Sequence, residues 1–115
     1  MAETIPGGLS VANDVIADMA GYAALESYGV VGMAAPTLSD GIAKLLPANR
    51  LRRGINVEMT EEGVHVDLYI VVEHGTNLAE VSRMLAEKVK FVLNDSAQLP
   101  VAGVDIHVQG IKVRN

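Results

Sequence analysis

The chain has no cysteine, no tryptophan and a single phenylalanine among its 115 residues. Without cysteine, neither a disulfide framework nor a thiolate metal site can form, and the composition is consistent with a reducing compartment. With so few large aromatic side chains, the core has to be built from small aliphatic residues. We therefore expect helices that lie close to a sheet.

Long apolar runs and an excess of basic residues are missing as well. No apolar run reaches the roughly 20 residues that cross a bilayer, and the first residues lack the basic and apolar regions of a secretion signal. These absences predict a cytoplasmic protein without direct membrane insertion. The net charge is −5, and residues 1–43 contain five acidic residues but no lysine or arginine. This distribution disfavours binding to nucleic acid or to anionic lipid.

The clearest pattern that is present lies in the second half of the chain. Apolar residues occupy every even position from 64 to 72 and again from 104 to 108, which predicts two strands with one buried face each. Between them, residues 78–92 carry apolar side chains at helical spacing, and Asn77 followed by Glu80 is typical of a helix N-terminus. A strand, a helix and a strand in this order predict a parallel pair joined by a right-handed crossover.

The first half of the chain predicts a second helix. Residues 1–9 are expected to form a loose lead-in with a short edge strand near Ile5, and Ser10 is a suitable N-cap. An apolar stripe follows from Ala12 to Ala23, and Gly29 is placed to end the helix as a left-handed C′ residue.

The middle of the chain is expected to contain several short elements. They are a buried strand at 30–34, a short helix at 37–46, a polar connector at 48–54, and a strand at 55–59 that turns through Gly63 into the next strand. Taken together, the patterns predict one α+β domain over residues 1–115. Its mixed sheet of three to four strands carries two main helices on one face.

The opposite face of that sheet is the predicted interaction face. It would present His65, Asp67, Tyr69, Val71, Asp105, His107 and Gln109. Docking of a second protomer or a protein partner, with Tyr69 and Val71 as apolar anchors, is favoured over a metal site on this face. A solvated polar face, which mixed sheets commonly have, is the other interpretation. Open strand edges at 55–59 and 104–113 would also permit strand-to-strand assembly.

A metal site on this face is the alternative. Parallel neighbours would bring His65 and His107 together with an aspartate nearby, which is ligand chemistry for a divalent cation or for a pH-sensing pair. Neither histidine belongs to a motif with metal-ligand spacing, so no metal and no cofactor are expected.

The basic residues Arg50, Arg52 and Arg53 form the other cluster of interest. Three arginines could bind a phosphate or a partner's carboxylates. The favoured interpretation is a solvated loop whose charge is balanced by acidic residues of the next hairpin, namely Glu58, Glu61 and Glu62. The segment from Gly29 to Gly32 matches the Gly-x-x-Gly of RNA-binding KH domains in its letters, but a structural turn is favoured there.

Three local patterns together resemble a known family. Gly29-Val-Val-Gly-Met33 follows an alanine-rich helix, Asp67-Leu-Tyr-Ile-Val-Val-Glu-His-Gly75 leads into Asn77-Leu78, and the chain closes with Val104-Asp-Ile-His-Val-Gln-Gly-Ile111. These segments resemble the alkaline shock protein family of Gram-positive and related bacteria, also called envelope stress response proteins. The resemblance implies a cytoplasmic protein that self-associates as a homo-oligomer and supports the cell envelope through a membrane-anchored protein partner.

Catalytic signatures are not found in the sequence. It contains no phosphate-binding loop, no dinucleotide fingerprint, no zinc-protease motif and no nucleophile elbow. We therefore expect a non-enzymatic interaction protein. A KH-like RNA-binding module that uses the three arginines is the first alternative function, and a small metal-binding protein that uses the sheet-face histidines is the second.

Overall fold

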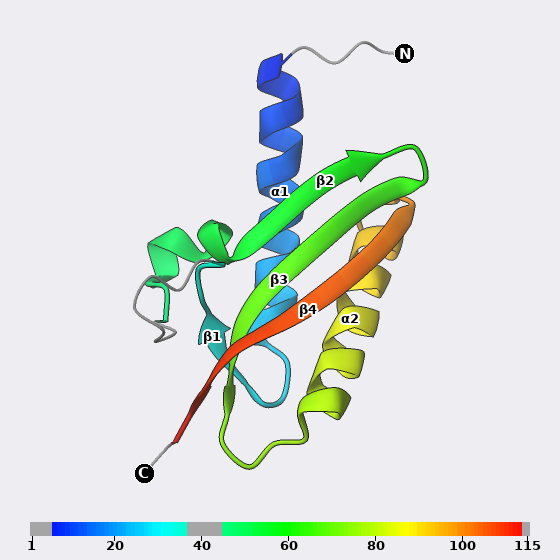
Figure 1. The fold of residues 1–115 in the computed structure, drawn as a ribbon. Helices are drawn as coiled ribbons and strands as arrows, with labels where there is room; N and C mark the ends of the chain where they lie inside the picture. Colours follow the sequence, from blue (N-terminus) through cyan, green and yellow to red (C-terminus); the bar gives the residue numbers. More distant parts are fainter. Residues whose placement is uncertain (1–5, 37–44, 114–115) are drawn as a thin grey trace.

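The computed structural model describes residues 6–36 and 45–113 (Figure 1). Its elements are α1 (Pro6–Leu25), β1 (Val30–Met33), the 3-10 helix η1 (Ala48–Gly54), β2 (Ile55–Thr60), β3 (Gly63–Glu73), α2 (Leu78–Asp95) and β4 (Val101–Lys112). The predicted α+β class is confirmed, as are the strand–helix–strand order of the second half and the strand at 30–34.

Strand β3 organises the sheet. It pairs antiparallel with β2 over its first half and with β1 over its second half, while β4 runs parallel to it on the other side. The predicted mixed sheet is therefore confirmed, and its four strands reach the upper end of the expected number. The handedness of the crossover through α2 remains a prediction.

Both helices pack on one face of this sheet (Figure 1). Helix α2 buries a stripe at every fourth residue, and α1 contributes mainly alanines, including the fully buried Ala20 and Ala24. Such small side chains let α1 lie close to the strands. Val66 and Ile70 are fully buried beneath the helices, while Ile106 on the edge strand is partly buried against the same core. The prediction that the apolar residues at even positions of these two strands face the core is confirmed.

The start and end of α1 differ from the prediction. The helix begins at Pro6, so Ser10 lies inside it and residues 6–9 of the expected lead-in are helical, while Ile5 lies outside the described residues. Proline suits the first turn because its missing N–H has no helical partner there. At the other end the helix stops at Leu25, four residues before Gly29.

Gly29 does adopt the predicted left-handed conformation, with φ of +86°, but in the turn between α1 and β1. A Cβ at this position would lie 2.8 Å from Cγ2 of Val81. The glycine therefore lets the turn pack directly against α2. A loop that joins a helix to a strand and faces the core is not the helix–helix loop that a KH domain uses for RNA.

The predicted turn chemistry of the second half is confirmed. Gly63 closes the β2–β3 hairpin with φ of +130°, and the Thr60 hydroxyl donates to the Gly63 carbonyl at 2.7 Å. At the start of α2, Oδ1 of Asn77 accepts from the Glu80 N–H at 3.0 Å. The Glu80 carboxylate does not complete a capping box, because it accepts a hydrogen bond from Arg83 at 2.7 Å.

The segment between β1 and β2 contains two departures. The expected polar connector at 48–54 is the 3-10 helix η1. The short helix expected at 37–46 falls mostly outside the described residues, but Leu45 forms an isolated antiparallel bridge with Ala34, and the Leu46 N–H donates to the Met33 carbonyl at 2.8 Å. The chain therefore returns beside β1 before it enters η1.

Candidate functional site

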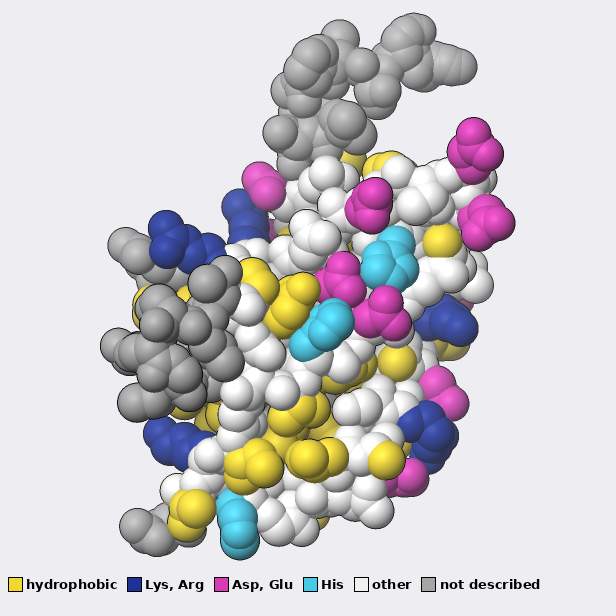
Figure 2. Space-filling view, in the orientation of Figure 1, with side chains coloured by type: hydrophobic (Ala, Val, Ile, Leu, Met, Phe, Trp, Pro, Cys, Tyr) yellow, Lys and Arg dark blue, Asp and Glu magenta, His cyan; other side chains and the backbone are white. Residues whose placement is uncertain are grey.

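The outer face of the sheet, which faces away from both helices, brings histidine and acidic side chains together (Figure 2). In the parallel register of β3 and β4, Asp67 lies beside Asp105 and Tyr69 beside His107, while His65 is paired with Gly103. No register shift interrupts this stretch, so side chains that share a face on one strand meet those on the other. We call His65, Asp67, Asp105 and His107 the His–Asp cluster.

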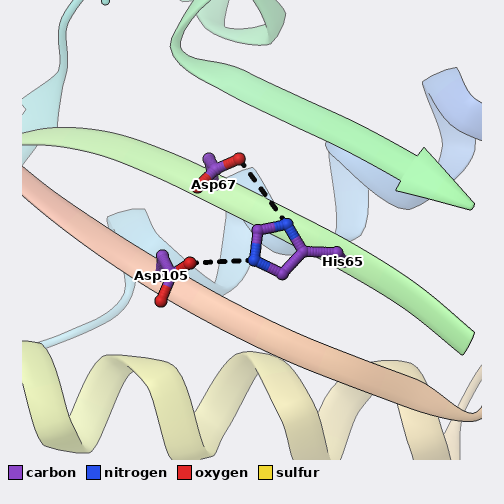
Figure 3. Close-up of side chains that lie close together, drawn as sticks. All are labelled: His65, Asp67 and Asp105. Carbon is purple, nitrogen blue, oxygen red and sulfur yellow. Dashed lines mark hydrogen bonds and ion pairs between the residues drawn. The ribbon is translucent and has the colours of Figure 1, made fainter. Parts of the chain in front are cut away.

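Within the cluster, imidazoles and carboxylates alternate. His65 Nε2 lies 2.8 Å from Asp105 Oδ2, and its Nδ1 lies 3.7 Å from Asp67 Oδ2 (Figure 3). Asp67 Oδ1 in turn lies 3.0 Å from His107 Nε2. The predicted approach of the two histidines is thus realised through Asp67, which lies between them.

Two further contacts hold this arrangement in place. The rings of Tyr69 and His107 stack with centroids 4.4 Å apart and an interplanar angle of 11°. Asn56 on β2 donates to Asp67 Oδ2 at 3.5 Å. The cluster is therefore supported by side chains from three strands of a rigid sheet.

Asp67 is the most enclosed acid of the cluster, with 17% of its side chain exposed. Burial by itself would raise the pKa of this carboxyl group. The hydrogen bonds from His107 and Asn56, and the nearby charges of the two imidazoles, outweigh burial and hold the pKa of Asp67 below its ordinary value. Asp67 therefore remains an anion at neutral pH.

Val71 was predicted to be an exposed apolar anchor, and this prediction is wrong. Only 4% of Val71 is exposed. Its register partner on β1 is Gly32, where a Cβ would lie 2.8 Å from Cδ2 of Leu45, so the Leu45 side chain lies close to this part of the outer face. Of the two predicted anchors, only Tyr69 remains accessible.

Gln109 from the predicted set contacts the residues that directly follow β1. Its side-chain amide donates to the carbonyl of Ala35 at 3.2 Å and to that of Pro36 at 3.1 Å. Gln109 therefore fastens the segment after β1 to the edge strand, which is a structural role that the sequence did not indicate.

One member of the arginine cluster, Arg52, is bound to α1. Arg52 donates to both carboxylate oxygens of Asp18, each at 2.8 Å, and its Nη1 lies 3.4 Å from Asp14. The expected balance by Glu58, Glu61 and Glu62 is therefore wrong for Arg52. Two acids at i and i+4 of one helix hold its guanidinium, which makes Arg52 a poor phosphate ligand. Arg53 is exposed, and the Arg50 side chain lies outside the described part.

The Asp18–Arg52 pair leads to a prediction about pH. The hydrogen bonds from Arg52 hold the pKa of Asp18 below its ordinary value of 3.8, so its contribution to stability is present above that pH and is lost as the pH falls further. Because the pair is largely exposed, Asp18→Asn should lower Tm at pH 7 by less than about 5 °C. Thermal unfolding at pH 7 and pH 3 should show the difference from the unmodified protein shrinking at the lower pH. Glu61→Gln is the exposed control.

The alkaline shock protein 23 family, described as having a cell envelope-related function, has a family model that matches residues 1–113. The chain belongs to this family. The resemblance stated from three sequence segments is thereby confirmed, and it extends over nearly the whole chain.

Relatives in the alkaline shock protein family come from Gram-positive bacteria. Protein YloU of Bacillus subtilis is 40% identical over 110 residues, covering 95% of this chain and 92% of the relative. Protein Spy1614 of Streptococcus pyogenes is 38% identical over 111 residues, with 96% and 92% covered. Protein YqhY of Bacillus subtilis is 27% identical over 110 residues, with 96% and 81% covered.

Solved structures share the fold at much lower identity. A zinc form of a MamM C-terminal domain variant superposes with a TM-score of 0.51 at 10% identity, over 91% of this chain and 89% of that one. Another variant of the same domain gives a TM-score of 0.52 at 10% identity, with 91% and 99% covered. At this identity the likeness extends to the fold alone.

Helix length and composition also bear on membrane association. In the described ranges, neither helix combines the length and the apolarity that crossing a membrane requires.

Proposed function

We propose that this alkaline shock family protein is a non-enzymatic, self-associating module of the cell-envelope stress response. It would act on the cytoplasmic side of the membrane through a membrane-anchored protein partner. Membership in a family of cell envelope-related function supports a role at the cell envelope. The observation that carries self-association is the outer sheet face, which neither α1 nor α2 covers and on which an aromatic stack is bordered by carboxylates.

This face suits a second copy of the same chain. It offers imidazoles and carboxylates side by side, and an isologous interface brings the same patch of both copies together, so histidines of one copy could meet aspartates of the other. The Tyr69–His107 stack provides an accessible aromatic centre within a polar rim, which is the usual composition of a protein interface. The arrangement supports pairing face to face.

The edge of β4 is less suitable for assembly. Strand β4 shifts register against β3 at two points, where it contains one extra residue each, Ala102 and Gln109. Bulges of this kind, together with the charged Asp105 and Lys112, hinder the addition of a further strand. Docking on the face is therefore better supported than strand pairing along β4.

Light scattering across a concentration series tests this proposal. Tyr69→Ala removes the aromatic centre, so we expect the dimer dissociation constant to rise by about tenfold or more. Tyr22→Ala is the matched control, because Tyr22 lies on α1 in the opposite layer and is 68% exposed.

Two outcomes would contradict the proposal. A protein that stays monomeric at all concentrations would exclude self-association. Equal weakening by the two tyrosine substitutions would exclude the outer face as the interface. Far-UV circular dichroism of each variant shows whether the fold is retained.

A further inference from the structure

We propose that the His–Asp cluster binds one divalent transition-metal ion, with Zn²⁺ as the reference cation and His65, Asp67 and Asp105 as ligands. One ligand atom from each of the three residues lies within 4.8 Å of the other two. His65 lies between the two carboxylates, one carried by β3 and the other by β4 (Figure 3). One imidazole nitrogen and two carboxylate oxygens form a donor set that Zn²⁺ accepts in proteins.

The distances are close to those of a bound ion. Zn²⁺ binds nitrogen and oxygen ligands at about 2.0–2.2 Å, so neighbouring ligand atoms around a tetrahedral ion lie roughly 3.4 Å apart. For an ion to bind, the distance of 2.8 Å between His65 Nε2 and Asp105 Oδ2 has to increase slightly. Any pair of ligand atoms near the upper limit of 4.8 Å has to move closer together. These changes require the two aspartate side chains to rotate, since the strands that carry them are paired by backbone hydrogen bonds. Solvent fills the remaining coordination positions.

Asp67 is already oriented for this role. His107 holds its Oδ1 at 3.0 Å, and Oδ2 lies on the His65 side, where it also accepts from Asn56 at 3.5 Å. The stacked ring of Tyr69 in turn fixes His107. Outer partners of this kind position metal ligands and raise metal affinity. His107 is therefore a positioning residue and not a ligand.

Gly103 is an independent feature of the same site. It is the register partner of His65, and a Cβ there would lie only 3.1 Å from Cδ2 of the His65 ring. The missing side chain leaves space in which the imidazole lies across β4 toward Asp105. Because the ligands come from two hydrogen-bonded strands, the site needs no loop to close around the ion.

The test is Zn²⁺ titration of the full chain by calorimetry after removal of metal with a chelator. We expect one equivalent to bind, and we expect His65→Asn and Asp105→Asn each to weaken binding at least tenfold. His107→Ala should weaken binding through its effect on Asp67. His74→Ala is the matched control, because it removes an exposed histidine outside the cluster and should leave the affinity unchanged.

A second readout examines the coordination itself. Co²⁺ in place of Zn²⁺ should give visible absorption bands that His65→Asn abolishes and His74→Ala retains. The proposal is overturned if the unmodified protein and His65→Asn bind Zn²⁺ equally, or if His74→Ala removes the binding. Circular dichroism of the metal-free variants confirms folding. The titration is done at a concentration where light scattering shows a single species, so its outcome is independent of self-association.

Discussion

Gly63→Ala should destabilise the protein by about 2 to 4 kcal/mol, as measured by urea unfolding. Gly63 closes the β2–β3 hairpin with φ of +130°, a conformation that residues with a Cβ rarely adopt. The new Cβ would also meet the carbonyl group of Pro100, which lies where β4 begins alongside β3. That carbonyl accepts a hydrogen bond from the Val64 N–H at 2.9 Å, so it cannot move away freely.

Gly75→Ala is the matched control for this effect. Gly75 has φ of +93°, but no other group lies within 4 Å of the position that its Cβ would occupy. Its replacement by alanine should therefore lower the free energy of unfolding only through backbone strain, by about 1 to 2 kcal/mol. The difference between the two variants measures the close approach of the β4 start to the hairpin. Equal losses of unfolding free energy in the two variants would show that the Pro100 carbonyl moves away from the new Cβ without destabilising the protein.

Leu68→Ala should destabilise the protein by about 2 to 5 kcal/mol, because it removes a buried side chain at the centre of the sheet. Leu68 is fully buried, and its register partners are Ile55 on β2 and Ile106 on β4. With two neighbouring strands and the helix layer around it, the cavity has little scope to collapse. Urea unfolding, with its midpoint and slope compared between variants, gives the free energy of unfolding.

The control for the core substitution is Met59→Ala. Met59 lies near the end of the edge strand β2 and is 48% exposed, so its loss should lower the free energy of unfolding by less than about 1 kcal/mol. A loss at Leu68 no larger than the loss at Met59 would contradict the placement of the core beneath the two helices.

The proposed metal site and the proposed interface share residues. A bound ion that engages His65 and Asp105 would remove them from contacts with a second copy. By linkage, metal and self-association should then change each other's affinity by the same factor. Light scattering with and without Zn²⁺ would measure this coupling once each process is established.

Much of the outer-face cluster could be predicted from local patterns. Alternation in residues 64–72 and 104–108 determines which side chains share a face, because successive residues of a strand point in opposite directions. The parallel pairing of these two strands then brings His65, Asp67, Asp105 and His107 together. Asn77 and Gly63 were predictable for a similar reason, since a helix start and a tight hairpin turn depend on only a few neighbouring residues.

The sequence by itself determined the strand faces, the helix that follows Asn77, and membership in the alkaline shock family. Only the tertiary structure decided that Val71 is covered, that Arg52 binds Asp18 on a helix 34 residues earlier, and that Gly103 makes room for His65. The physical reason is the separation along the sequence over which each interaction acts. Backbone periodicity and turn chemistry act between near neighbours, whereas these contacts form only where separate elements meet in space.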